Sequence, residues 1–149
     1  MKRCVLDTSV GVKWFSQAGE EDLAQALKLR QEFIEGQARL LVPELFFVEL
    51  ANALRYNPHF SVGDVQAALS SVWSMELERV DLSSQALKEV VHVAYQYDVT
   101  LYDAIFLALA KAADAELVTA DYSLCRKIRG LPYVLPLKNL DQVKDSGRE

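Results

Sequence analysis

The sequence has 149 residues, of which 51% are hydrophobic and 25% charged, and its formal net charge at pH 7 is −5. The length favours one compact domain, and the balance of hydrophobic and charged residues excludes an extensively disordered chain. The negative charge argues against non-specific polyanion binding over the whole surface, but it does not exclude a local basic patch.

Two classes of protein are disfavoured by the pattern of apolar residues and cysteines. No run of about 18 apolar residues is present, so no membrane-spanning helix is indicated. The N-terminal residues Met-Lys-Arg-Cys-Val-Leu-Asp reach an acid too soon for a signal peptide, and a cytoplasmic protein without a membrane partner is expected. Cys4 and Cys125 lack the neighbouring ligands of a zinc motif, so buried thiols are expected.

The first buried strand is predicted at residues 3–7, where a short apolar run ends in Asp7. Asp7 therefore lies at the C-terminal edge of a strand, although it can equally serve as the N-cap of a short helix that follows. Further on, the acids of residues 20–22, the helical apolar spacing and Gly36 predict a surface helix whose acidic first turn is solvated.

A second strand is predicted at residues 40–42, and Pro43 is placed as the first residue of a helix over 43–56. Glu49 in that helix lies among apolar neighbours at helical spacing. The structural alternative is a partly exposed glutamate whose stem lies on apolar surface.

The next helix begins at a capping box formed by Ser61 and Asp64. Together with the preceding helix it forms an apolar hairpin that either packs internally or projects as an association surface. A third strand is predicted at 78–82, and Ser83 or Ser84 caps the following helix. The core positions expected in that helix are Leu87, Val90, Val91 and Ala94.

Residues 100–113 contain almost no polar side chains, so they predict a helix inside the domain. Their one acid, Asp103, lies in the first turn, where unpaired backbone N–H groups and the helix dipole favour a carboxylate. Thr100 and Asp103 are also spaced like a capping box, so a purely structural role for Asp103 stays open.

The last part of the chain repeats the pattern of the first strand. A strand at 116–119 ends in Thr-Ala-Asp, and Asp121 either lies at the strand's C-terminal edge as a functional acid or caps the short helix that closes at Gly130. A short strand follows at 133–135, and residues from about 140 to 149 are expected to form a flexible tail.

Short buried strands that alternate with helices predict an α/β sandwich with a parallel sheet, and such sheets bind ligands at the C-terminal ends of their strands. Asp7 and Asp121 follow two of these strands directly. Asp103 begins the helix before the second of them, and Glu49 projects from the helix after residues 40–42. The topology therefore predicts that four acids from distant segments meet at one edge.

Four segments carry a resemblance to a known family. They are Val-Leu-Asp-Thr-Ser, Val-Glu-Leu-Ala-Asn-Ala-Leu, Leu-Tyr-Asp-Ala-Ile-Phe-Leu-Ala-Leu-Ala and Leu-Val-Thr-Ala-Asp. In this order, over nearly the whole chain, they resemble a PIN domain and, more narrowly, the VapC toxins of prokaryotic toxin–antitoxin pairs. The resemblance implies a three-layer α/β/α sandwich around a parallel sheet and a single nuclease domain over residues 1–149. It further implies a Mg²⁺- or Mn²⁺-dependent ribonuclease that forms a homodimer and is inhibited by a VapB-type antitoxin.

The family's acidic quartet falls on Asp7, Glu49, Asp103 and Asp121, with Ser9 and Thr119 at supporting polar positions. Several carboxylates in one pocket repel each other, and a hard divalent ion relieves that repulsion and activates a water against a phosphodiester. We expect the three aspartates to be the main metal ligands, with Glu49 binding a second ion or orienting the water. Candidates for phosphate contacts are Lys13, Arg126, Lys127 and Arg129, although a solvated surface explains the last three equally well.

Three other functions remain compatible with the sequence. The chain can be a PIN-type RNA-processing nuclease outside a toxin pair, or a catalytically silent interaction module whose contact surface is the hairpin of residues 43–76. A phosphoacceptor receiver domain also places acids at strand ends, but no matching lysine follows the last acid-bearing strand.

Overall fold

The structure is a computed structural model that describes residues 1–142. Its elements are β1 (Lys2–Leu6), α1 (Thr8–Val12), α2 (Leu23–Ile34), β2 (Ala38–Pro43), α3 (Leu45–Arg55), α4 (Val62–Ser74), β3 (Glu78–Val80), α5 (Ser84–Tyr97), α6 (Leu101–Ala113), β4 (Glu116–Thr119), α7 (Tyr122–Lys127), β5 (Val134–Pro136) and the 3-10 helix η1 (Leu137–Gln142). Within these residues no helix is both long and apolar enough to cross a membrane.

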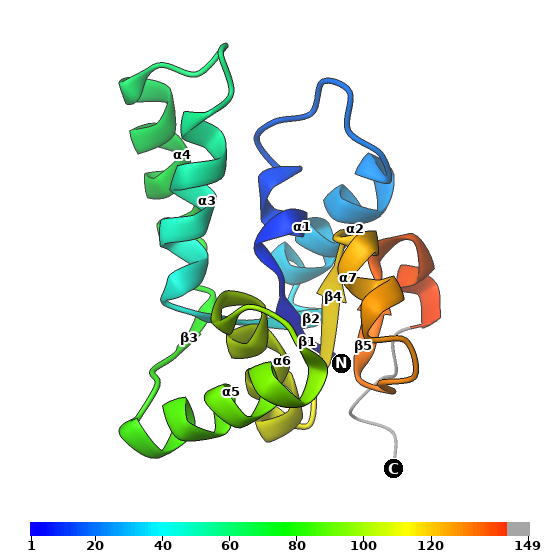
Figure 1. Cartoon of the computed structure of the whole chain (residues 1–149). Coiled ribbons are helices and arrows are strands. Elements are labelled where there is room, and N and C mark those ends of the chain that lie inside the picture. The colour runs from blue at the N-terminus through cyan, green and yellow to red at the C-terminus, as the bar shows by residue number, and fades with distance from the viewer. Residues whose placement is uncertain (143–149) are drawn as a thin grey trace.

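The five strands form one parallel sheet in the order β3-β2-β1-β4-β5 (Figure 1). The central strand β1 pairs with β2 on one side and β4 on the other. Its residues Cys4, Val5 and Leu6 are fully buried, as expected for a strand that is covered on both faces. The C-terminal ends of β1 and β4, which precede Asp7 and Asp121, therefore lie side by side.

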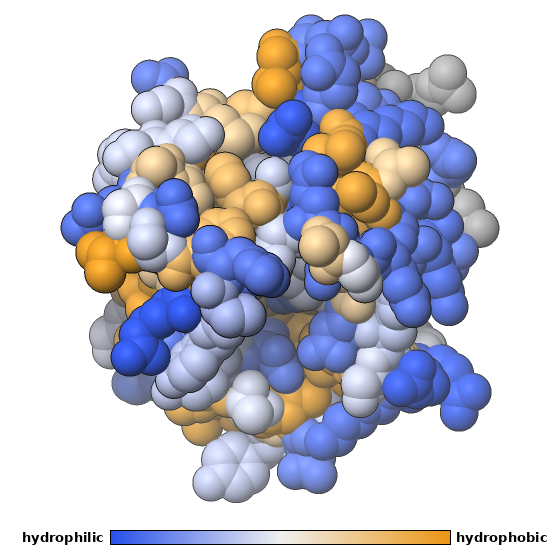
Figure 2. All heavy atoms as spheres, turned by 90° about the horizontal axis from the view of Figure 1, so that it is seen from above, coloured by the Kyte–Doolittle hydropathy of each residue, from blue (hydrophilic) through white to orange (hydrophobic). Residues whose placement is uncertain are grey.

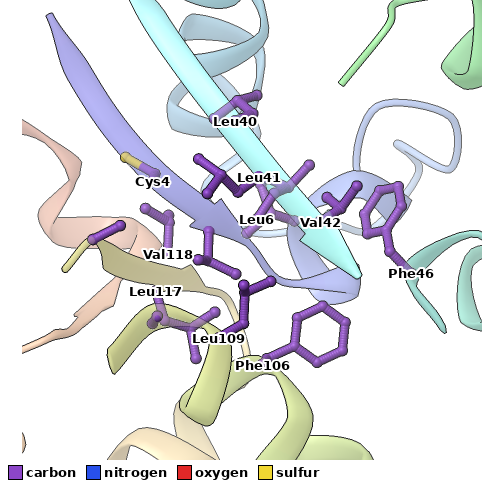
Figure 3. Close-up of a cluster of buried hydrophobic side chains, with 14 of the residues drawn as sticks. Cys4, Leu6, Leu40, Leu41, Val42, Phe46, Phe106, Leu109, Leu117 and Val118 are labelled. Atoms are coloured by element: carbon purple, nitrogen blue, oxygen red, sulfur yellow. The ribbon is translucent and has the colours of Figure 1, made fainter. Parts of the chain in front are cut away.

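Helices cover both faces of this sheet. Helix α6 contacts β1, β2 and β4 on one face and carries α5 on its outer side, whereas α2 and η1 cover the other face. Figure 3 shows Phe106 and Leu109 of α6 reaching toward the side chains of the central strands. The predicted three-layer α/β/α sandwich with a central parallel sheet is thus confirmed.

Helices α1 and α3 touch at Gly11, because this residue has no side chain. A Cβ atom there would lie 2.8 Å from the ring of Phe46, which is less than two carbon atoms tolerate. Phe46 is itself fully buried. This contact holds α3, and with it Glu49, against the turn that follows β1.

The hairpin of α3 and α4 packs internally and also exposes apolar surface. The rings of Phe47 and Trp73 lie 4.8 Å apart at their centroids, and Ser61 and Asp64 form the predicted capping box at the start of α4. However, Val48 and Val62 are 64% and 76% exposed. One face of the hairpin therefore packs internally, and the other face leaves apolar side chains exposed.

Several predicted boundaries differ from the structure. Pro43 ends β2 instead of opening a helix, because its missing N–H is tolerated at the end of a strand. The acids of residues 20–22 precede α2, and Asp22 caps it in a left-handed conformation with φ of 55°. In α5 the buried residues are Val90, Val93 and Ala94, while Leu87 and Val91 face solvent.

The predicted flexible tail was placed too early at residue 140, which lies in a packed helix. Leu140 belongs to η1 and is 1% exposed, because η1 packs its apolar side on the sheet. The remaining part of the predicted tail, residues 143–149, lies outside the described residues.

Candidate active site

Asp7 lies at the C-terminal end of β1 and is 8% exposed. Its carboxylate accepts hydrogen bonds from the backbone N–H of Ser9 at 3.2 Å, from the Ser9 hydroxyl, and from Thr119 Oγ1 at 3.1 Å. It also caps α1, so the structural role that the sequence left open is real. Burial raises the pKa of Asp7 to about 6, although these hydrogen bonds oppose the shift.

The hydroxyls of Ser9 and Thr119 join the ends of β1 and β4. Ser9 Oγ accepts from the backbone N–H of Ala120 at 2.9 Å, and Thr119 Oγ1 accepts from that of Asp121 at 3.0 Å. Each hydroxyl has one hydrogen, and both hydrogens point to Asp7. The two predicted supporting residues therefore couple the position of Asp7 to that of Asp121.

Asp121 follows β4 and caps α7 by accepting the backbone N–H of Leu124 at 3.0 Å. It is half-buried, in contrast to Asp7. The cap fixes one carboxylate oxygen at the helix start, and the other oxygen of the same group is left for the site.

Asp103 lies in the first turn of α6, one turn from its cap. Thr100 Oγ1 accepts the backbone N–H of Asp103 at 3.1 Å, which is half of the predicted capping box. The second half is missing, because within the described residues the Asp103 carboxylate does not accept the Thr100 N–H. A side-chain hydrogen bond with Thr100 nevertheless opposes the rise in the pKa of Asp103.

Glu49 is half-buried on α3 and accepts a hydrogen bond from Thr8 Oγ1 at 2.8 Å. Thr8 was not singled out in the sequence, although it lies within the Asp-Thr-Ser motif. Burial raises the pKa of Glu49, Thr8 opposes the shift, and the charge of Asp103 adds to it.

Among the four acids, Asp103 is the one whose charge interacts with each of the others. Burial raises the pKa of Asp103, and the charge of Asp121 raises it further. The Asp103 charge in turn raises the pKa values of Asp7 and Glu49. Asp103 is therefore electrostatically coupled to each of the other three predicted acids.

This group of oxygen atoms suits a hard divalent cation such as Mg²⁺ or Mn²⁺, which prefers carboxylates and retains several waters. Within the described residues, however, no group of three or more His, Cys, Asp and Glu side chains is placed so that it could hold a metal ion.

The four basic candidates differ in availability. Lys13 is 7% exposed and pairs with Glu20 at 2.9 Å, so the loop between α1 and α2 already neutralises it. Lys127 is closer to the site, since its charge lowers the pKa of Asp103. Arg126 and Arg129 are exposed on and beyond α7.

A second contact of the loop between α1 and α2 was also missed in the sequence. The Tyr122 hydroxyl donates to the carboxylate of Asp22. Tyr122 directly follows Asp121, so this bond ties the start of α7 to the start of α2. The only sequence signal is a tyrosine beside a site acid, and its partner lies 100 residues away.

The surface has a small pocket beside two of the acids and a larger groove elsewhere. A small pocket of about 160 Å³ is lined by Asp103, Asp121, Thr100, Ser123 and Lys127 among others. A larger groove of about 520 Å³ lies on the α3–α4 hairpin, away from the four acids, and is lined mainly by apolar side chains such as Val48, Phe60, Val62 and Val65. Figure 2, which views the molecule from above, shows hydrophobic atoms over this hairpin at the left.

The comparisons with known proteins agree with this arrangement. A model of the PIN domain family matches residues 4–129, whereas no curated protein matches the chain. The chain is similar to one in a toxin–antitoxin complex from Klebsiella pneumoniae, with 20% identity, a TM-score of 0.67, and coverage of 90% of this chain and 97% of that chain.

Two further solved structures share the fold. VapBC2 from Rickettsia felis, bound to promoter DNA, gives 17% identity, a TM-score of 0.63, and coverage of 90% and 98%. VapC20 from Mycobacterium tuberculosis, a toxin that cleaves the sarcin-ricin loop, gives 13% identity, a TM-score of 0.62, and coverage of 82% and 94%. Since the family model matches residues 4–129, which is most of the sequence, the chain belongs to the PIN domain family.

Proposed function

We propose that the protein is a divalent-metal-dependent endoribonuclease and the toxin of a VapBC-like pair. The observation that carries the proposal is the electrostatic coupling of Asp103 to each of the other three acids, with Asp103 and Asp121 lining one pocket. Asp7, Asp103 and Asp121 would hold Mg²⁺ or Mn²⁺ directly or through water. Glu49 would hold a second ion or orient the attacking water.

The ion, when bound, supplies charge neutralisation and a more acidic water for attack on a phosphodiester. The residues of the chain supply position. Ser9 and Thr119 fix Asp7 by two hydroxyl hydrogen bonds, and Thr8 fixes Glu49. Burial and the charge of Asp103 raise the pKa of Glu49, which favours a role for it in proton transfer from the attacking water.

The proposed partners rest on surfaces away from the acids. The apolar groove on the α3–α4 hairpin has a size and lining suited to an apolar helix of a small VapB-type antitoxin. Helix α5 presents Leu87, Val91 and Tyr95 to solvent, at 46%, 43% and 86% exposure and at successive helical turns. We assign this stripe to a homodimer contact. The similarity to chains in toxin–antitoxin complexes supports the antitoxin partner. A toxin acting on cellular RNA would work in the cytoplasm.

Cleavage of total cellular RNA tests the proposal. The purified chain should cleave RNA in the presence of Mg²⁺ or Mn²⁺ and lose this activity on chelation. Asp103→Ala should abolish cleavage and relieve growth arrest on expression, whereas Asp81→Asn, an exposed acid on the loop after β3, should leave both unchanged. Full cleavage by Asp103→Ala would contradict the nuclease site. Cleavage by the wild-type protein without growth arrest would favour an RNA-processing nuclease over a toxin.

A further inference from the structure

We infer that the small pocket between α6 and α7 is a subsite for one backbone phosphate of single-stranded RNA, next to the phosphate that is cleaved, with Lys127 and Ser123 as its contacts. The inference rests on the proposed function. It names residues that position the RNA strand, and it selects Lys127 from the four basic candidates of the sequence.

The size of the pocket limits what it can hold. Its volume is about 160 Å³, whereas pockets for drug-sized ligands run from about 300 to 1,000 Å³. A complete small molecule is therefore not enclosed, but one group of an extended chain fits. Because Asp103 and Asp121 line the same pocket, a strand whose cleaved phosphate lies at the acids passes through it.

The lining of the pocket combines a positive charge with a hydroxyl. Lys127 and Ser123 lie one turn apart on α7, on the side that faces Asp103. The charge of Lys127 reaches this aspartate, since it lowers the pKa of Asp103. Ser123 is exposed, and within residues 1–142 its hydroxyl makes no hydrogen bond to the protein. An ammonium and a free hydroxyl are common contacts of phosphate oxygens.

Lys127 is available to such a phosphate in a way that Lys13 is not. Its Nζ lies 3.8 Å from a carboxylate oxygen of Asp98, whose side chain is fully exposed, so this ion pair is weak. Lys13, by contrast, is buried against Glu20. Arg129 lies beyond the end of α7 and does not line the pocket, which makes it a matched control of the same charge.

The test measures binding of a short fluorescein-labelled single-stranded RNA by anisotropy over a series of KCl concentrations, in an Asp7→Asn background that does not cleave. Each phosphate contact contributes about 0.7 to the slope of log affinity against log salt for a single strand. Lys127→Ala should weaken binding about fivefold at low salt and reduce the slope by about 0.7. Lys127→Arg should restore the slope.

Two further variants should change RNA binding in ways that a merely structural role of these residues would not produce. Ser123→Ala should weaken binding about twofold without changing the slope, because it removes a neutral contact. Asp98→Asn should tighten binding, because it frees Lys127 and removes a negative charge near the strand; asparagine tolerates the left-handed backbone of this residue, whose φ is 52°. In the cleaving enzyme, Lys127→Ala should raise KM with little change in kcat.

The outcomes separate this inference from the proposed function. If the wild-type chain neither binds nor cleaves RNA, the nuclease proposal fails. If it cleaves RNA while Lys127→Ala leaves the salt slope unchanged, the subsite is wrong and the nuclease proposal stands. An equal loss of slope in Arg129→Ala would also overturn the subsite, because it would indicate a general basic face instead of one pocket.

Discussion

The ends of β1 and β4 place an aspartate at the same point of the sheet, yet the two aspartates have different surroundings. Asp7 is 8% exposed and accepts two side-chain hydroxyl bonds, whereas Asp121 is half-buried and accepts a backbone N–H of its own helix. Asp7 therefore depends on its own turn and also on Thr119 from another strand, whereas the Asp121 carboxylate caps the helix of its own turn. The same short motif thus gives one buried acid with a raised pKa and one half-buried acid.

Among substitutions at the two strand ends, the largest effect is expected at Asp7. Asp7→Asn should reduce metal-dependent RNA cleavage by more than about 100-fold, which exceeds what loss of a supporting partner costs. In the absence of metal it should nevertheless stabilise the fold at pH 7, because a neutral amide avoids the burial of a charge. Chemical denaturation without metal measures the expected gain in stability, and a cleavage assay measures the expected loss of activity. A variant that lost stability as well as activity would contradict the view that Asp7 is a charge kept for function.

The pH dependence of stability without metal should show the same cost. The pKa of Asp7 is about 6 in the folded state and about 3.9 in an unfolded chain. Between these values the folded state binds the additional proton, so the stability is fully present below about pH 4 and falls as the pH rises through 6. The loss is about 3 kcal/mol for a shift of this size.

Denaturation curves of wild type and Asp7→Asn at pH 4 to 8 isolate this contribution, since the difference between the two removes other groups. The free energy of unfolding of wild type should fall relative to the variant across this range. Added Mg²⁺ or Mn²⁺ should restore wild type more than the variant, because an ion that binds only the folded state stabilises it. A difference that rose with pH would give the opposite sign and exclude a buried, costly charge at Asp7.

The hydroxyl of Thr119 tests the coupling between the two strand ends. Thr119→Val keeps the shape of a fully buried side chain but removes the donor to Asp7 and the acceptor of the Asp121 N–H. We expect a loss of about 1–3 kcal/mol in stability and about 10- to 100-fold in cleavage. Thr119→Ser is the matched control, because it retains the hydroxyl. Equal activity in the valine and serine variants would show that the hydroxyl bond does not position Asp7.

The sequence was sufficient for features that depend on local patterns. Apolar runs that end in acids located β1 and β4, and the spacing of Ser61 and Asp64 predicted a capping box that the structure contains. The parallel topology also predicted that Asp7, Glu49, Asp103 and Asp121 lie at one edge, because the C-terminal ends of parallel strands meet there. The coupling of Asp103 to the other three acids supports this, and a shared catalytic site stays a prediction.

The features that were predicted wrongly or missed depend on partners far along the chain or on competition between neighbours. The acids of residues 20–22 were assigned to a solvated helix turn, but Glu20 pairs with Lys13, and Asp22 accepts the hydroxyl of Tyr122. No periodicity in the sequence encodes these pairings. At Thr100 a capping box was predicted, yet only the half in which the Thr100 side chain accepts the Asp103 N–H is present.

The smallest effect on stability is expected at Asp121, where two substitutions separate helix capping from a role in the site. Asp121→Asn retains a side-chain oxygen that can accept the Leu124 N–H, so stability without metal should change by less than about 0.5 kcal/mol. Asp121→Ala removes the cap and should cost about 1 kcal/mol. Both variants should lose cleavage if the charge belongs to the site. Asp7→Asn is expected to gain stability whereas Asp121→Asn is not, and thermal denaturation of the two variants under one condition compares the strand ends directly. Equal gains in stability would mean that the burial of Asp7 and its hydrogen bonds with Ser9 and Thr119 do not distinguish it from Asp121. The position at the end of a strand would then account for both acids.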